Sequence, residues 1–222
     1  MASDTKRRIL DAAESLMGDK GFTSTSMRDI TTAAKVNLAS INYHFGSKEA
    51  LLASVLERRL QPINEKRLEL LDALELENSD AGIRHQDIVR AFVSPPFQQQ
   101  QQWGGNSETF LRLLGRLHSE TNEEFRQVFM SEYELVFQRF AVALQRALPH
   151  LTNTNLPWRM LFMVGSMALT MSWGQSMMLR KDNSSTPSDV LNELIEFTCA
   201  GLAAPVVTVV SNPQHLQEQE VL

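Results

Sequence analysis

Residues 26–48 restrict what this chain can fold into more than any other segment does. Their sequence is SMRDITTAAKVNLASINYHFGSK. Ser26 is suited to cap a first helix, Lys35-Val36-Asn37 form a three-residue turn, and a second short helix follows before a long helix starts at Lys48. Proteins use such a helix-turn-helix to place one helix in the major groove of DNA. The segment therefore predicts a DNA-binding head.

The rest of the pattern is helical, and no segment alternates apolar and polar residues as a strand would. Gly21 ends a first amphipathic helix, and the helix from Lys48 is expected to reach about residue 76, with room for a bend near Pro62. Further helices are expected at about 85–93, 107–119, 122–147, 156–180 and 187–203. Pro95-Pro96 should end the first of these, which leaves 94–106 as a loop, either a permissive connection or a mobile lid.

These elements predict an all-α fold with an N-terminal three-helix DNA-binding domain and a larger helical effector-binding and dimerisation domain. The expected boundaries are 1–47 for the DNA-binding domain, 48–204 for the larger domain and 205–222 for a flexible tail. The long fourth helix belongs to both domains and can transmit a lever motion between them.

The charge distribution suits local contact with phosphate groups. Up to residue 61, Lys and Arg outnumber Asp and Glu by nine to seven, whereas the rest of the chain has twelve against nineteen. Cys199 is the only cysteine, which excludes an intrachain disulfide, and the apolar run 160–173 is too short to span a bilayer. We therefore expect a cytoplasmic protein with no membrane partner.

The polar residues around the turn are the candidates for reading DNA. Ile30, Val36 and Ile41 are among the apolar residues expected to lock the two helices together, which leaves the opposite face for bases and phosphates. Asparagine can pair with adenine, serine with base edges or phosphate, and an alanine methyl group with thymine. The predicted DNA-contacting residues are Thr25, Ser26, Arg28, Asn37, Ala39, Ser40, Asn42, Tyr43, His44 and Lys48. Ser40 or Asn42 alone would suit an ordinary solvated surface, but the ordered set indicates DNA binding.

Several short motifs occur together in the head: Gly21-Phe22, Arg28-Asp29-Ile30 and the run YHFGSKEAL from Tyr43 to Leu51. Residues 8–56, which contain them, resemble the N-terminal domain of the TetR family of one-component transcriptional repressors. The resemblance implies a homodimer on a palindromic operator, with the last two helices of each chain forming a four-helix bundle. Many relatives carry glycine where this chain has Lys35, so the turn is expected to use left-handed backbone there. Many also carry tyrosine in place of Asn42, so base preference does not transfer at that position.

The body shows a second resemblance, carried by FLRLLG at 110–115, Tyr133 with Phe137, and Trp158-Arg159 with FMVG at 162–165. These are similar to the PsrA-type branch of the family, whose members are associated with long-chain fatty acids or related acyl effectors. The middle helices also carry a surplus of apolar and aromatic residues, and the predicted effector residues are Phe92, Phe110, Leu113, Leu114, Leu117, Phe129, Tyr133, Phe137, Phe162 and Met163. The candidates for a polar anchor are Arg112, Arg116, His118 and Arg159. The apolar members suit a helical core as well as a pocket.

The last two predicted helices carry the expected dimer interface. Its predicted residues are Met160, Met167, Met171, Leu191, Leu194, Ile195, Thr198 and Leu202. Methionines at helical spacing fit a plain core, a dimer interface or a pocket lining, and the sequence leaves these three alternatives open.

The sequence predicts a homodimeric repressor that a small apolar effector releases from its operator. The alternative is a DNA-binding regulator without a small-molecule effector, controlled by a protein partner. An enzyme is not expected, and no metal or cofactor is predicted, because the histidines lack metal-ligand spacing and no nucleophile is paired with a base. Cys199 lies in an apolar helical context and is expected to be inert.

Overall fold

The computed structural model describes residues 2–78, 82–103, 109–110, 113, 133–178 and 186–206, and every regular element in these ranges is an α-helix. The predicted all-α class is therefore confirmed. Most of the predicted helix 107–119, the first part of 122–147 and the tail after residue 206 lie outside the described residues.

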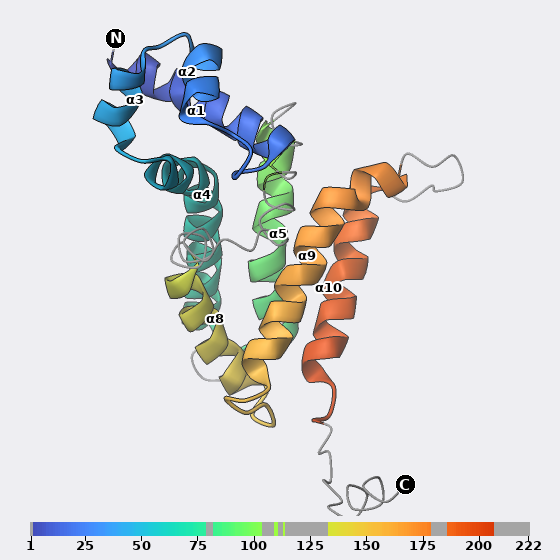
Figure 1. Cartoon of the computed structure of the whole chain (residues 1–222). Helices are drawn as coiled ribbons and strands as arrows, with labels where there is room; N and C mark the ends of the chain where they lie inside the picture. Colours follow the sequence, from blue (N-terminus) through green and yellow to red (C-terminus); the bar gives the residue numbers. More distant parts are fainter. Residues whose placement is uncertain are drawn as a thin grey trace, which may run out of the picture.

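The helices form a small N-terminal head on a larger body (Figure 1). The head contains α1 (Ala2–Lys20), α2 (Met27–Ala34) and α3 (Leu38–Phe45), and α4 (Lys48–Glu77) runs from the head into the body. The body contains α5 (His85–Trp103), α8 (Glu134–Ala147), α9 (Leu156–Met178) and α10 (Pro187–Ala203). Helices α9 and α10 pack along one another, and α5 packs against both α4 and α10. Within the described ranges, no helix combines the length and apolar character needed to cross a bilayer.

The head helices begin and end where the sequence predicts. Gly21 follows α1 with a φ of 87°, a left-handed backbone that residues with a Cβ rarely adopt. Ser26 and Asp29 form a capping box, in which Ser26 Oγ accepts from the Asp29 amide at 3.1 Å and the Asp29 carboxylate accepts from the Ser26 amide at 2.9 Å. Ser47 caps α4 by accepting from the amide of Ala50 at 3.1 Å. These caps fix where each helix of the head starts.

Apolar packing divides the molecule into two cores that share α4. The head core is built on Ile9, Ile30 and Ile41 and continues along α4 as far as Leu60. The body core includes Leu71, from the other end of α4, together with side chains from α5, α8, α9 and α10. Helix α4 therefore contributes side chains to both cores.

Helix α5 continues through Pro95 and Pro96, so the prediction that these residues end it is wrong. A proline has no N–H, and the carbonyl groups four residues earlier lose their helical donors. For Phe92 the loss is offset, because Arg67 Nε of α4 donates to its carbonyl oxygen at 2.8 Å. Packing of α5 against α4, α8 and α10 thus outweighs the local preference for a break. The segment 94–103 is helix rather than a loop or a lid, and 104–106 lie outside the described residues.

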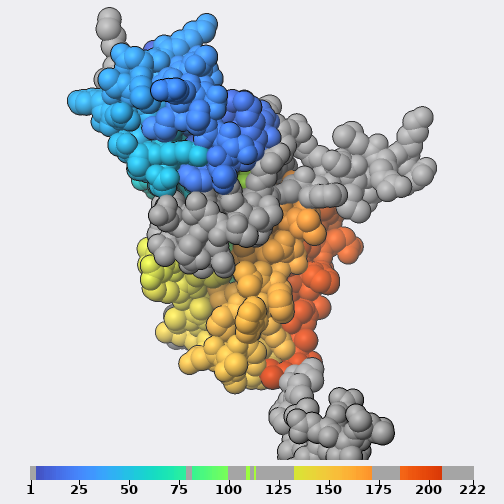
Figure 2. Space-filling model, in the orientation of Figure 1, coloured from blue at the N-terminus to red at the C-terminus, as the bar shows by residue number. Residues whose placement is uncertain are grey.

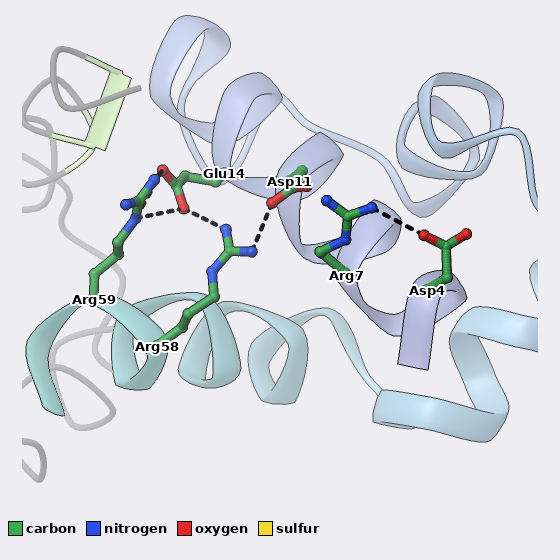
Figure 3. A network of polar contacts seen from close by, with 6 residues as sticks. All are labelled: Asp4, Arg7, Asp11, Glu14, Arg58 and Arg59. Carbon is green, nitrogen blue, oxygen red and sulfur yellow. Dashed lines mark hydrogen bonds and ion pairs between the residues drawn. The ribbon is translucent and has the colours of Figure 1, made fainter. Parts of the chain in front are cut away.

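A buried carboxylate joins α1 to α4 (Figure 3). The side chain of Glu14 is only 4% exposed, and its carboxylate accepts from Arg58 Nη2 and Arg59 Nη2, each at 2.5 Å. Arg58 also reaches Asp11 through Nη1 at 2.6 Å. Two neighbouring arginines of α4 thereby hold two carboxylates that lie one turn apart on α1.

Thr109, Phe110 and Leu113 pack against the head. Phe110 and Leu113 are buried in the head core, and the guanidinium of Arg59 lies 5.8 Å from the centroid of the Phe110 ring. At Gly18 of α1 the approach is so close that an added Cβ would lie 2.6 Å from the carbonyl oxygen of Thr109. A side chain at position 18 would therefore prevent this contact.

The Gly18→Ala variant should lower the free energy of unfolding by about 1–3 kcal/mol, because the Thr109 carbonyl group must move to admit the methyl group. Gly165→Ala in α9 is the matched control, since nothing lies within 4 Å of its added Cβ. Alanine's higher helix propensity should leave that variant unchanged or stabilised by up to about 1 kcal/mol. Urea unfolding followed by circular dichroism measures both, and equal stability of the two variants would contradict the close contact.

The Glu14→Gln variant should be destabilised by about 3 kcal/mol, because it leaves two arginines without their buried charged partner. Asp4→Asn is the control, since Asp4 pairs with Arg7 at 3.0 Å on the exposed surface of α1 (Figure 3). It should leave the unfolding midpoint unchanged, because water screens such a pair. If thermal unfolding shows the same small effect for both variants, Glu14 does not hold α1 to α4.

Candidate nucleic-acid interface

Lys35 sets the turn between α2 and α3. Its backbone is left-handed, with φ 54° and ψ 49°, which confirms the prediction made for this position. The amide of Lys35 donates back to the end of α2, and Arg8 of α1 donates from Nη1 to the carbonyl oxygen of Ala34 at 3.3 Å. The end of α2 is therefore held by its own turn and by α1.

Asn37 begins α3 as its N-cap. Its Oδ1 accepts from the amide of Ser40 at 2.8 Å and from Ser40 Oγ at 2.9 Å. Asn37 is exposed and Ser40 is half-buried, so the cap orders two of the predicted DNA-contacting residues at the start of α3.

Ile41 determines which face of α3 points outward. Its side chain is fully buried in the head core, whereas Ala39, Asn42 and Tyr43 are exposed. The Tyr43 side chain is 85% exposed, and its ring makes an edge contact with His44 at 5.2 Å between centroids. Figure 1 shows α3 at the outer edge of the head, away from α9 and α10. This outer face is free to meet a large partner.

Leu38 is an exposed residue that the sequence reasoning missed. It lies in the first turn of α3 and shares the outer face with Asn42, four residues later. An apolar side chain there can meet the methyl group of a thymine. The outer-face spacing was visible in the sequence, but a leucine is normally assigned to the core.

The residues predicted to contact phosphates differ in their exposure and in their neighbours. Arg28 is exposed in the first turn of α2, and His44 is half-buried between two aromatic rings. Lys48 Nζ lies 4.3 Å from the centroid of the Phe22 ring and 3.5 Å from the carbonyl oxygen of Thr23. Lys48 opens α4, where the backbone amides of the first turn also favour an anion.

The structure contradicts the role predicted for Thr25. Its side chain is buried, and Oγ1 donates to the carbonyl oxygen of Gly21 at 2.8 Å and lies 3.2 Å from that of Leu16. The hydroxyl group closes the turn after α1 and is not at the surface to bind a phosphate. Ser26 is exposed, but its Oγ already donates to the Asp29 carboxylate at 2.7 Å.

The predicted effector residues are divided between the two cores. Phe92 and Met163 lie in the body core, Phe110, Leu113 and Tyr133 lie in the head core, and Phe137 packs against both. The ring of Phe92 makes edge contacts with Phe137 and with Phe140, at 6.0 and 5.1 Å between centroids. Leu114, Leu117 and Phe129 lie outside the described residues, as do the candidate anchors Arg112, Arg116 and His118.

Two further effector predictions are contradicted. Phe162 is 63% exposed on α9, so it does not line an interior pocket. Arg159 is occupied at the end of α10, where Nη1 donates to the carbonyl oxygens of Leu202 and Ala204 at 2.6 Å each. Arg159 therefore caps a helix and is not available as an anchor.

The residues predicted for the dimer interface lie mostly in the chain's own core. Those buried are Met160, Met167, Met171, Leu194, Ile195, Thr198 and Leu202, while Leu191 is partly buried against the same core. Of the three alternatives for the methionines, the plain core is the one these positions fit. Large apolar side chains are exposed on the same two helices, namely Trp158, Leu161, Phe162, Leu169 and Phe197. Figure 2 shows α9 and α10, in orange and red-orange, forming one side of the body below the head.

Cys199 is buried in the body core. Burial, together with the nearby charge of Glu196, raises the pKa of its thiol to about 11. The thiol is therefore protonated and unreactive at neutral pH. Among the described residues, no group of three or more His, Cys, Asp or Glu side chains could hold a metal ion.

Two sequence families match this chain. Residues 9–55 match "Bacterial regulatory proteins, tetR family", and residues 90–201 match "Tetracyclin repressor-like, C-terminal domain". Together they cover the helix-turn-helix and most of the body.

Curated relatives and solved structures agree with these matches. The chain is 33% identical over 108 residues to the HTH-type transcriptional repressor NicS of Pseudomonas putida, covering 44% of this chain and 51% of that protein. It is 28% identical over 143 residues to the A-factor receptor protein of Streptomyces griseus, covering 57% and 49%. The chain thus spans about half the length of these relatives.

Similarity to solved structures extends over nearly the whole chain. A TetR-family transcriptional regulator from Bordetella parapertussis superposes with a TM-score of 0.61 at 15% identity, covering 87% of this chain and 93% of that one. AibR, solved in complex with isovaleryl coenzyme A and operator DNA, gives a TM-score of 0.60 at 16% identity, covering 87% and 97%. These likenesses show a shared fold.

Proposed function

Because this chain belongs to the TetR family of bacterial regulatory proteins, we propose that it is a homodimeric transcriptional repressor that a small apolar effector releases from a palindromic operator. The observation that carries the proposal is the exposed outer face of α3, on a head whose caps and core fix the direction of that helix. The proposed domains are 1–47 for DNA binding and 48–204 for the effector and the partner chain.

In this proposal α3 enters the major groove. Asn37, Ala39, Ser40 and Asn42 would face base edges, and Leu38 would add an apolar contact. The proposed backbone contacts come from Ser26, Arg28, Tyr43, His44 and Lys48. Thr25 is left out because its hydroxyl group is buried in the turn.

The two kinds of DNA contact should respond differently to substitution. Lys48→Ala should weaken binding to all sequences alike and reduce the salt slope by about 1, and Tyr43→Ala should also weaken all sequences alike. Asn42→Ala should instead relax base preference at one position of each half-site by about 1–3 kcal/mol. Fluorescence anisotropy with operator variants over a range of salt concentrations measures both effects.

Lys66→Ala is the matched control, because Lys66 is an exposed lysine of α4 that pairs with Glu69 at 3.0 Å, outside the proposed interface. It should leave affinity and salt slope unchanged. An Asn42→Ala protein with an unaltered preference profile would contradict the role given to Asn42.

The proposed dimer interface is the outer face of α9 and α10. Trp158, Leu161, Phe162, Leu169 and Phe197 all expose more than half of their side chains there. Monomeric proteins rarely expose so many large apolar side chains on two adjacent helices, and a second copy of the chain would cover them. Pairing also supplies the second reading helix that a palindromic site requires.

Charge placed on this face should separate the dimer. Phe162→Glu should raise the dimer dissociation constant at least roughly a hundredfold, because a carboxylate would be buried without a partner. Leu135→Glu on α8 is the control, since Leu135 is equally apolar and exposed but lies on another helix. Sedimentation equilibrium gives the constant for each variant, and a Phe162→Glu protein that remains dimeric would place the interface elsewhere.

We also propose that the effector is a long-chain fatty acid or an acyl derivative, as in the PsrA-type branch. The edge-to-face rings of Phe92, Phe137 and Phe140 give the body core an apolar character suited to an acyl chain. The isovaleryl coenzyme A bound to AibR and the A-factor receptor's name support small-molecule control on this fold. Effector and operator would favour different positions of the heads, so that each weakens the binding of the other.

Acyl compounds should therefore release DNA-bound protein and raise its melting temperature in the absence of DNA. Anisotropy of labelled operator and differential scanning fluorimetry measure the two effects. If no compound of an acyl panel does either, control by a protein partner becomes the better reading.

A further inference from the structure

Arg67 of α4 is fully buried, with none of its surface exposed. Among the described residues, no carboxylate lies within ion-pair distance of its guanidinium, whereas Arg58, Arg59 and Lys66 of the same helix each pair with a carboxylate. A buried charge without an opposite charge is costly, and proteins usually pair it or use it. The charge on Arg67 therefore needs an explanation.

The partners of Arg67 in the described part of the chain are all neutral. Nε donates to the carbonyl oxygen of Phe92 at 2.8 Å, Nη1 donates to Asn64 Oδ1 at 3.0 Å, and Nη2 lies 3.6 Å from Met167 Sδ. The guanidinium also lies 4.1 Å from the centroid of the Phe92 ring and 5.8 Å from that of Tyr133. Tyr133 also forms a side-chain hydrogen bond with Arg67, and its hydroxyl group is as neutral as the amide, carbonyl and thioether partners.

A purely structural role accounts for only part of this arrangement. Nε replaces the helical donor that Pro96 cannot supply to the carbonyl oxygen of Phe92. A neutral donor could do the same. Burial lowers the pKa of Arg67, while Tyr133 opposes the shift, but an arginine keeps its charge in proteins. The neutral partners satisfy hydrogen bonds of the guanidinium, but its positive charge is left without a structural reason among the described residues.

We propose that Arg67 binds the carboxylate of the effector, which is then a free apolar carboxylic acid. The inference rests on the proposed function and deepens it by naming the head group and its anchor. The planar guanidinium matches a carboxylate in two-point contact. Methionine side chains are flexible, so Met167 can yield its place beside Nη2 to a carboxylate oxygen. Asn64 and Tyr133 flank the head group, and Phe92 and Phe137 offer apolar surface for the tail.

The position of Arg67 also connects the site to the head. Tyr133 lies beside the Arg67 guanidinium and belongs to the head core together with Phe110 and Leu113. Arg59, which holds Glu14 of α1, lies over the Phe110 ring. A carboxylate that displaces Met167 from Arg67 would therefore act on Tyr133, which shares the head core with the Phe110 ring beside Arg59.

The test compares straight-chain fatty acids with primary alcohols of the same chain length, by isothermal calorimetry on the full-length protein. Wild-type protein should bind the acids at least roughly tenfold more tightly than the alcohols, since a charge-assisted pair is lost with the alcohol. Arg67→Met replaces the guanidinium with an apolar side chain of similar length. This variant should lose the preference for acids. Arg139→Met removes the same charge where Asp72 and Glu75 already pair with it, and should retain the preference.

The wild-type comparison needs no variant, so it holds even if Arg67→Met fails to fold. Equal binding of acids and alcohols, no binding of acids, or a preference retained in folded Arg67→Met would each overturn the proposal. Operator affinity is measured on the same wild-type sample. Intact DNA binding with no preference for acids defeats only the Arg67 site, whereas absent DNA binding with a preserved preference defeats the proposed repressor function and leaves the site standing.

Discussion

The ion cluster between Glu14 and the arginines of α4 is the contact on which the geometry of the head depends. Helix α1 carries the apolar residues against which α2 and α3 pack, and Arg8 of α1 also holds the end of α2. Because Glu14 is buried between Arg58 and Arg59, α1 cannot slide or rotate on α4 without exposing uncompensated charge. Helix α4 thus fixes the direction of α3 by holding α1 in place.

Helix α4 belongs to both cores, so a change in the body has a path to the head. Along this path lie Arg67 in the body, Tyr133 and Phe110 at the junction, and Arg59 beneath α1. Gly18 brings α1 close to the backbone at Thr109, which makes the junction sensitive to small displacements. Packed side chains with discrete arrangements are the physical means by which such couplings are carried.

Local chemistry made much of the head predictable. Ser26 and Ser47 are suited to N-caps, and the family pattern marked Lys35 as the residue with left-handed backbone; all three are where the sequence places them. The features that failed depend on tertiary contacts. The end of α5 was misjudged because Arg67, far away in sequence, supplies the donor that Pro96 lacks. The sequence does not show which side chains of α9 are buried and which are exposed, because that helix is apolar all round and has no polar stripe to mark its outer face. The burial of Arg67 could not be predicted from the sequence, since an arginine in a long helix is normally exposed.

The central claim is that this chain reads DNA as one half of a symmetric pair. Selection of bound fragments from random DNA by the full-length protein tests it most directly. The predicted result is an enriched site with two inverted half-sites at a fixed spacing of about one helical turn or a multiple of it. Enrichment of a single unpaired half-site, or of no sequence at all, would contradict the account.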